Sequence, residues 1–239
     1  MNKMALKLVR IARSIPGFWS VIILSWKLIG PLMFRVSYRN KSRQGTVCLH
    51  VGAGNASIDG WLNTDILPPH LYMDMSQRLP IRDNSVAYIF GEHVIVYISR
   101  QAALEFFKES FRVLKPGGVL RIVTADIEAL SRTYIDDPES ANLLNERNRG
   151  RGYQYTSYPI DILNKQFFED NNLKVGIRLH CEYDFQTLEQ MFIIAGFGDI
   201  VRCKIGESRH AALSGIEQHD VGSIADKFTC VIEGTKLAL

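Results

Sequence analysis

The sequence predicts an α/β fold built on a doubly wound, mostly parallel sheet. From residue 46 onward, short apolar runs alternate with segments of helical periodicity. The run TVCLHV, residues 46–51, is nearly all apolar, as expected for a parallel strand buried on both faces. Residues 101–114 repeat apolar side chains at helical spacing and are followed by Lys-Pro-Gly-Gly, which ends helices. This alternation of strand and helix is typical of doubly wound sheets.

The other elements of the body continue the same alternation. We expect a helix over residues 185–195, closed by Gly196, and strands over 60–65, 86–90, 119–123, 200–205 and 228–233. Ligands of such sheets bind at the carboxyl ends of the strands. The positions that directly follow strands are 52–55, Asp65, Asp74, 91–93 and 124–126.

Residues 1–45 are predicted to form a helical unit in front of the domain of residues 46–239. Residues 3–15 place apolar side chains on one helical face and Lys and Arg on the other. A Pro-Gly pair ends this pattern, and residues 18–34 are then mostly apolar. We expect these two helices to pack over the body as a lid.

The apolar run 18–34 does not predict an integral membrane span. Lys27, Gly30 and Pro31 interrupt it, whereas a spanning helix needs about 20 predominantly apolar residues. A charge near the centre of such a helix costs about 3 kcal/mol. No small-residue cleavage site follows, so a secretory signal is not indicated. A peripheral contact with an anionic membrane stays open, because cations lie beside aromatic side chains in this segment.

The charge distribution gives no support to nucleic-acid binding. The net charge is +3, but residues 1–46 hold nine Lys and Arg and no acid, so the remainder has 19 basic and 25 acidic side chains. A basic leader in front of a mildly acidic body is enough to explain the net charge. The four cysteines are widely spaced, which favours a reducing cytoplasm, and no spacing resembles a metal site.

A glycine loop follows the first strand. Gly52, Ala53 and Gly54 let the backbone approach a ligand closely, because glycine has no Cβ. A nicotinamide site would need a third glycine where Ser57 stands and an acid about 20 residues on. Here Asp65 follows eleven residues after Gly54, and no G-x-x-x-x-G-K-[ST] motif is present. These departures argue against a dinucleotide or a nucleoside triphosphate.

Three segments in order resemble the class I S-adenosylmethionine-dependent methyltransferases. They are LHVGAGNASIDGWLNTDI (49–66), MDMSQRLPIRDNSVAYIFGEHV (73–94) and FRVLKPGGVLRIVTAD (111–126), and residues 183–197 fit the family's helix before its last strands. The ordered set is more specific than any one motif. The resemblance covers about residues 46–234 and is to bacterial members of the family that act on small molecules. It implies a seven-stranded Rossmann-like sheet with S-adenosyl-L-methionine as cofactor.

The resemblance implies cofactor-binding roles for the residues after the strands. The Gly52–Gly54 loop would pass under the methionyl part of the cofactor. Asp65, with Ile66 beside it, would accept hydrogen bonds from the ribose diol, as carboxylates do well. Asp74 would face the adenine amine and Met75 the adenine ring. For both acids an ordinary cap or turn role stays open.

The region after the fourth strand supplies the catalytic candidates. Glu92 and His93 keep the family's first Glu-His pair and are assigned to the cofactor site, but Val96-Tyr97 stands where the family has a second Glu-His pair. We expect the Tyr97 ring to face the sulfonium; the alternative is that Val96 and Tyr97 begin the next helix and pack. His93 and His180 are candidate bases, because histidine changes charge near neutral pH. A structural hydrogen-bonding role stays open for each.

A basic and aromatic stretch lies between the fifth strand and the last helix. Its members are Arg147, Arg149, Arg151, Tyr153, Tyr155 and Tyr158. The stretch is either a substrate loop for an anionic or sugar-like acceptor or a solvated, flexible loop.

The resemblance implies a methyltransferase for a small-molecule oxygen or nitrogen acceptor, in glycan or natural-product assembly. An alternative on the same cofactor is a cyclase similar to azetidine-2-carboxylate synthases, in which the cofactor's own amine displaces methylthioadenosine. Val96-Tyr97 and the apolar leader favour that alternative weakly. A non-catalytic binding subunit is disfavoured by the intact glycine loop, Asp65 and Glu92-His93.

Overall fold

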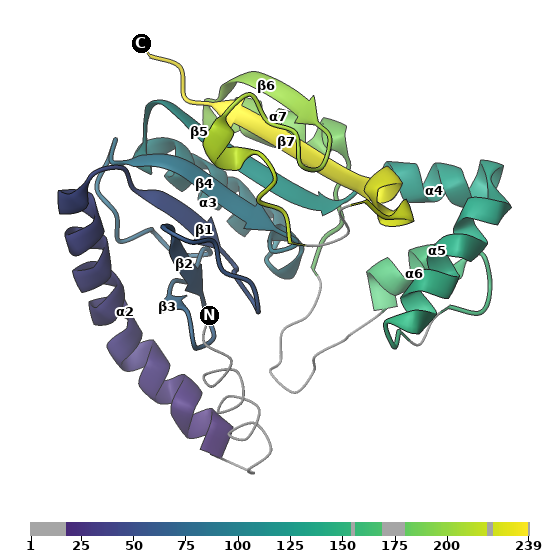
Figure 1. Cartoon of the computed structure of the whole chain (residues 1–239), viewed down its shortest axis with the longest axis horizontal. Coiled ribbons are helices and arrows are strands. Elements are labelled where there is room, and N and C mark those ends of the chain that lie inside the picture. The colour runs from purple at the N-terminus through teal and green to yellow at the C-terminus, as the bar shows by residue number, and fades with distance from the viewer. Residues whose placement is uncertain (1–17, 154–155, 169–179, 219–221, 239) are drawn as a thin grey trace.

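The structure is a computed structural model, which describes residues 18–153, 156–168, 180–218 and 222–238. It contains one seven-stranded sheet with helices beside it (Figure 1). The strands are β1 (Cys48–Val51), β2 (Leu62–Asp65), β3 (Leu71–Tyr72), β4 (Val86–Glu92), β5 (Leu114–Ala125), β6 (Gly198–Cys203) and β7 (Thr229–Thr235). Their order in the sheet is β3-β2-β1-β4-β5-β7-β6.

The sheet confirms the predicted fold class. Strands β1 to β5 pair in parallel, and β7 runs antiparallel to both β5 and β6. The carboxyl ends of β1, β2 and β4 therefore meet at one edge of the sheet, where such folds bind ligands. The two-residue strand β3 was implied only by the position of Asp74, and its bounds were not predicted, because so short a strand leaves no alternation to detect.

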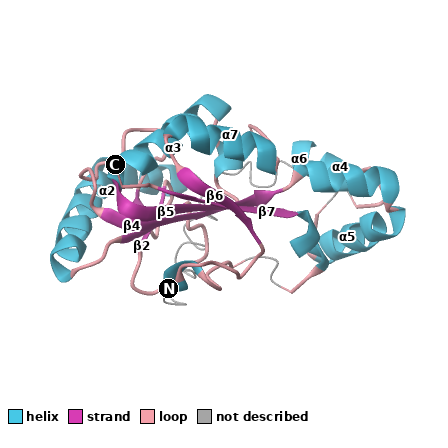
Figure 2. Cartoon of the chain, turned by 90° about the horizontal axis from the view of Figure 1, so that it is seen from above, coloured by secondary structure: helices cyan, strands magenta, loops and turns pink. Residues whose placement is uncertain are grey.

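Helices α3 (Arg100–Val113) and α7 (Phe185–Ala195) cover one face of the sheet (Figure 2). Phe107 of α3 meets Phe192 of α7 edge to face, with ring centroids 4.8 Å apart. Ser99 caps the start of α3, and Gly196 ends α7 with a φ of 101°, as predicted from its glycine. One of the two interpretations had Val96 and Tyr97 begin the next helix. They do not begin α3. They lie in a separate 3₁₀ turn, η1 (Ile95–Tyr97), because the cap at Ser99 starts the helix later.

The N-terminal helix α2 (Phe18–Gln44) is longer than predicted. The apolar run 18–34 was expected to be helical, and the observed helix continues through Pro31 and past residue 34 to Gln44. Phe34 and Tyr38, one turn apart, are buried in the main core, and this tertiary packing outweighs the cost of the proline. The other expected helix, over residues 3–15, falls outside the described residues. The helix α2 lies beside the edge strand β3 (Figure 1), and its action as a lid stays a prediction, as does the domain boundary near residue 45.

Three helices after β5 form a cluster beyond the end of the sheet (Figure 1). They are α4 (Ile127–Asp136), α5 (Pro138–Gly150) and α6 (Asp161–Phe168), with a small core of their own that includes Leu130, Leu144 and Ile162. The prediction of a flexible loop is therefore wrong for Arg147 and Arg149, which lie in α5. Arg149 also donates to the carbonyl of Thr156 at 2.6 Å, so α5 holds the segment that follows it.

A buried ion cluster holds the loop that covers the opposite face of the sheet. Arg121 of β5 is completely buried and donates to the carboxylates of Glu217 and Glu233. A buried arginine needs such partners, since an unpaired buried charge is costly. The 3₁₀ turns η3 (Ala211–Leu213) and η4 (Ile224–Phe228) lie on either side of Glu217 in the chain.

Candidate active site

The glycine loop follows β1 with two residues in the left-handed region. Gly52 has a φ of 63° and Gly54 a φ of 55°, which glycine adopts without steric cost. A Cβ at Gly52 would come within 2.1 Å of the Cγ2 atom of Val94, whereas a Cβ at Gly54 would meet nothing closer than 4.0 Å. Gly52 is therefore required for packing against the β4 end. Gly54 leaves open space above the loop.

Asp65 joins the glycine loop to the end of β2. Its Oδ2 accepts from the Gly54 amide and its Oδ1 from the Leu67 amide, both at 2.9 Å. The Ala53 amide donates to the Thr64 carbonyl at 2.9 Å, which is a second link between the same segments. Since a carboxylate oxygen has more than one lone pair, Asp65 can hold the loop and still accept from a ligand hydroxyl. Asp65 is half-buried, as is Ile66 next to it.

His70 is a member of this edge that sequence reasoning missed. Only 7% of this histidine is exposed. Burial lowers the pKa of its imidazole, against the opposing charge of Asp65 and a hydrogen bond with the Gly54 backbone. Its buried Nε2 atom has no hydrogen-bond partner. No sequence pattern marks it, because its burial arises where the connection between the parallel strands β2 and β3 packs against Gly54, in the loop after β1.

Asp74 and Met75 follow β3 at the same edge. Oδ1 of Asp74 accepts from the backbone amide of Ser76 at 3.0 Å and from its hydroxyl at 2.6 Å. This is the turn chemistry that was the alternative for Asp74, and it occupies one of the two carboxylate oxygens. Met75 is 7% exposed and packs in the main core.

Glu92 and His93 lie at the end of β4. The Oε2 atom of Glu92, which is 6% exposed, accepts from the Gln218 amide at 3.0 Å. His93 has a φ of 51°, uncommon for a residue other than glycine, and its amide donates to the Val123 carbonyl at 2.8 Å. The chain therefore turns sharply where β4 ends, and such conformations concentrate at functional sites.

The segment 180–183 runs along this edge between the ends of β4 and β5. The amide of His180 donates to the Val96 carbonyl at 2.7 Å, and the amide of Ile127 donates to the Tyr183 carbonyl at 3.0 Å. These bonds bring the predicted residues His180 and Tyr97 into neighbouring positions. Both side chains are accessible, and Tyr97 is 44% exposed.

Glu182, in the same segment, is a further residue that sequence reasoning missed. Burial raises the pKa of its carboxyl group to about 7, and the nearby charge of Lys165 opposes that shift. Its Oε2 atom is buried and has no hydrogen-bond partner. The pKa of Tyr97 is also raised, first by partial desolvation and then by Tyr153 and Glu182. Tyr97, Tyr153, Lys165 and Glu182 therefore form one electrostatic group, which we call the acceptor-side cluster.

Tyr153 connects this cluster to the helices after β5. The Nζ atom of Lys165 in α6 lies 4.5 Å from the centroid of the Tyr153 ring. Of the predicted basic and aromatic stretch, Tyr153 therefore reaches the acceptor-side cluster, whereas Tyr158 is 69% exposed. Tyr155 falls outside the described residues.

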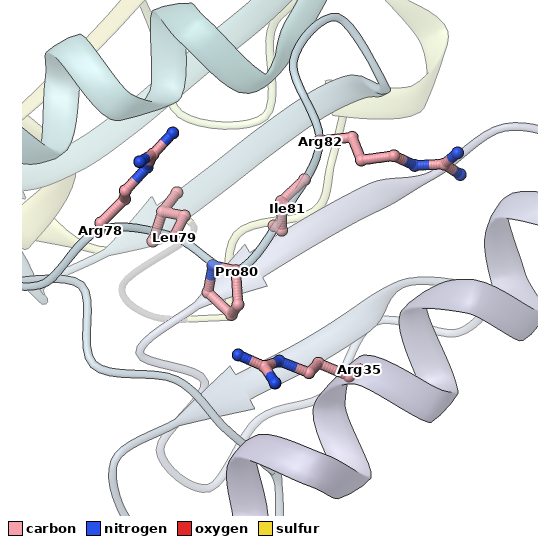
Figure 3. A pocket seen from close by; sticks show the side chains of 6 residues that line it. All are labelled: Arg35, Arg78, Leu79, Pro80, Ile81 and Arg82. Atoms are coloured by element: carbon pink, nitrogen blue, oxygen red, sulfur yellow. The ribbon is translucent and has the colours of Figure 1, made fainter.

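A separate pocket lies on the amino side of β4, between α2 and the segment that precedes β4 (Figure 3). It is lined by Arg35, Arg78, Leu79, Pro80, Ile81 and Arg82. The three arginine side chains point in different directions (Figure 3), so they do not converge on one anion. None of these lining residues is among the predicted site residues. Within the described ranges, no group of three or more His, Cys, Asp or Glu could hold a metal ion.

Residues 49–122 match the family model described as a methyltransferase domain. This segment, which holds β1 to β4, α3 and most of β5, is therefore similar to a methyltransferase domain. The match confirms the resemblance to the class I enzymes and, with it, S-adenosylmethionine as the cofactor. No curated protein matches the chain.

Solved structures similar to the chain are distant in sequence. A Thermotoga maritima protein described as a SAM-dependent methyltransferase, "possible histamine N-methyltransferase", aligns over 91% of this chain and 99% of its own, at 16% identity and a TM-score of 0.43. A SAM-dependent methyltransferase from Archaeoglobus fulgidus aligns over 88% and 94%, at 12% identity and a TM-score of 0.46. Phosphoethanolamine N-methyltransferase 2 from Haemonchus contortus, in complex with S-adenosyl-L-methionine, aligns over 81% and 49%, at 14% identity and a TM-score of 0.42. These similarities leave the acceptor of this chain open.

Proposed function

We propose that the protein transfers the methyl group of S-adenosylmethionine to an oxygen or nitrogen atom of a small molecule. The observation that carries this proposal is Glu182, a half-buried residue beside the end of β4 whose Oε2 atom is buried without a hydrogen-bond partner and whose carboxyl pKa is raised to about 7. At neutral pH such a group is partly ionised, and it can accept a proton from a hydroxyl or an ammonium group.

The cofactor side of the proposed site fits S-adenosylmethionine. The open space at Gly54 admits a ligand above the loop, and Asp65 presents a carboxylate to a ribose diol. Asp74, with one oxygen in its own turn, would use the other for the adenine amine. When bound, the cofactor supplies a methyl group activated by a sulfonium. Methyl transfer then depends mainly on the positions of the two reactants.

The acceptor side of the proposed site is the acceptor-side cluster together with His180. Glu182 would take the proton of the acceptor, and Lys165 would stabilise the carboxylate before the proton arrives. The Tyr97 ring would lie beside the sulfonium charge, which aromatic rings stabilise by about 0.5–2 kcal/mol. His93 and His180 stay candidate bases. A cytoplasmic location and a role in glycan or natural-product assembly are further parts of this proposal.

The cyclase alternative has no specific support among the residues that the structure describes. It calls for an enclosed aromatic pocket, whereas Tyr97 is 44% exposed and α2 packs at the outer edge of the sheet. The same experiment can still test it.

The experiment incubates the protein with S-adenosylmethionine, first alone and then with a panel of small phenols, sugars and amines. S-adenosylhomocysteine that forms only with an acceptor would support methyl transfer, and loss of that product in Glu182→Gln would support the proton-accepting role. Methylthioadenosine formed without an acceptor would overturn the proposal in favour of cyclisation. Tight cofactor binding with no product under any condition would instead indicate a binding subunit.

A further inference from the structure

The helix α2 exposes an apolar face that nothing in the described structure covers. Its members recur three or four residues apart, which places them on one side of the helix. They are Val21, Leu24, Leu28, Leu32 and Val36, each between 51% and 74% exposed. The opposite side, with Gly30, Phe34 and Tyr38, is buried against the sheet domain. Five large apolar side chains in one exposed row mark an interaction surface rather than scattered surface residues.

Positive charge continues the same side of the helix. Arg35, Arg39 and Arg43 follow the apolar row at intervals of four residues and are exposed. The helix contains no acidic residue, and the first carboxylate of the chain is Asp59. The partner of this surface should therefore be apolar at one end and anionic at the other.

The apolar end of α2 projects past the sheet at the edge that holds the candidate active site. A Cβ at Gly30 would lie 2.3 Å from the Cβ of Tyr72, the last residue of β3, so the helix passes very close to the carboxyl end of that strand. Farther along the helix, the Tyr38 hydroxyl donates to Ser85, which precedes β4, at the opposite edge. Residues 18–29 therefore lie past this strand end, in a part of the helix that is roughly 18 Å long at 1.5 Å per residue. Figure 1 shows this purple end of α2 projecting past β3.

One helix of the described chain, Ser20–Gln44, is long and apolar enough to cross a membrane by length and composition. Two features oppose a full crossing. Lys27 lies within the apolar part, and Phe34 and Tyr38 are fixed in the protein core. The apolar length that remains before Phe34 is shorter than the roughly 20 residues of a span. An amphipathic helix that lies in the membrane interface meets neither objection.

We propose that α2 docks the protein on the surface of an anionic bilayer. The row from Val21 to Leu32 inserts at the boundary of the acyl chains, and Arg35, Arg39 and Arg43 bind lipid phosphates. The helix then lies with its N-terminal end deeper, and the carboxyl edge of the sheet faces the membrane. This inference goes beyond the proposed function and does not depend on it, because docking requires neither cofactor nor turnover.

The test is sedimentation of the full-length protein with vesicles of phosphatidylcholine and phosphatidylglycerol, compared with vesicles of phosphatidylcholine alone. Wild-type protein should bind the anionic vesicles, and binding should weaken at high salt. The double variant Leu24→Glu with Leu28→Glu should bind about a hundredfold more weakly. A matched control, Ile135→Glu with Ile194→Glu, removes two leucine-sized side chains that are equally exposed elsewhere (71% and 60%) and should bind as wild type does.

A second set of variants tests the charge component. Replacing Arg35, Arg39 and Arg43 by Gln should weaken binding by roughly fivefold for each arginine. The control replaces three exposed cations outside α2, Arg132, Lys204 and Arg209, and should leave binding unchanged. Thermal melting followed by circular dichroism establishes that each variant is folded. If the double glutamate variant is not folded, the double variant Leu24→Gln with Leu28→Gln replaces it in the vesicle experiment.

Two outcomes would overturn the proposal. One is equal binding of wild type and the Leu24 and Leu28 variants to anionic vesicles. The other is a wild-type protein that ignores vesicles but forms a concentration-dependent dimer that the same variants dissociate, because the partner would then be a second copy of the chain.

Discussion

Replacing Asp65 by Ala should weaken S-adenosylmethionine binding by roughly 10- to 150-fold. The carboxylate of Asp65 accepts from the amides of Gly54 and Leu67, both at 2.9 Å, and thereby faces the open side of the glycine loop. Hydrogen bonds to a charged group contribute about 1.5–3 kcal/mol each. The loss of one such bond to the cofactor gives the stated range, since about 1.4 kcal/mol corresponds to a factor of ten.

The same substitution should cost little stability. Gly54 is exposed, so water can replace the carboxylate at its amide, whereas Leu67 is half-buried. We expect the free energy of unfolding to fall by about 0.5–2 kcal/mol. Asp65→Asn should retain an acceptor for one of the amides and lose less stability, but it removes the charge and should still bind the cofactor more weakly than wild type.

The assay is calorimetric titration with S-adenosylmethionine, alongside thermal unfolding of each protein. Asp59→Ala is the matched control, because it removes an exposed acid from the same segment. Unchanged affinity in a folded Asp65→Ala protein would remove Asp65 from the site. An equal loss in Asp59→Ala would show that the effect is one of general charge.

Three further predictions concern the loop, the acceptor side and Tyr97. Gly52→Ala should lower the free energy of unfolding by about 2–5 kcal/mol, because of its left-handed backbone and the clash with Val94. Gly54→Ala has open space around it and should lower the free energy of unfolding by only about 1–2 kcal/mol. Equal values for the two variants in denaturant titrations would contradict the packing assigned to Gly52. The pKa of Glu182 is raised to about 7 in the folded protein, so turnover should rise with pH through about 7 and Glu182→Gln should lose that limb. Because the folded state holds this proton more tightly than the unfolded state does, the stability of wild type should fall as the pH rises from about 4.5 to 7. Glu182→Gln should be about 1–3 kcal/mol more stable than wild type at pH 8. A wild-type stability that does not change over this pH interval would contradict the assignment. Tyr97→Ala should reduce turnover by about 2- to 30-fold, while Tyr97→Phe should keep most of it if the ring face acts on the sulfonium; near-normal turnover in Tyr97→Ala would mean that the ring only packs.

The parts of the fold that depend on local patterns could be predicted. Buried apolar runs gave β1 and β4, and helical periodicity with terminal glycines gave α3 and α7. The helices α4 to α6 were missed, because their apolar residues are few and their core includes Ala225 and Phe228 from the far end of the chain. The full length of α2 was missed for a related reason, since residues 35–44 are mostly polar and are held in the helix by the burial of Phe34 and Tyr38.

The candidate site divides in the same way. The Gly52–Gly54 loop and Asp65 are close in the chain and belong to one motif, so their proximity follows from the sequence. Glu182 and His70 could not be identified, because what distinguishes each is burial produced by distant segments. A glutamate or histidine in a polar stretch has no local feature that reports its future environment.

This division has a consequence for how the protein selects its acceptor. The glycine loop and Asp65 of the cofactor side lie in one short stretch of chain and depend on backbone geometry, which leaves them little freedom to vary. The acceptor side is assembled from η1, α6 and the segment 180–183. Two hydrogen bonds, from His180 to Val96 and from Ile127 to Tyr183, hold the segment 180–183 between the ends of β4 and β5. A change at Tyr153, Lys165 or Glu182 can therefore alter the charge and shape presented to the acceptor while Asp65 and the glycine loop keep their geometry. Acceptor preference and cofactor affinity should thus respond to separate sets of substitutions.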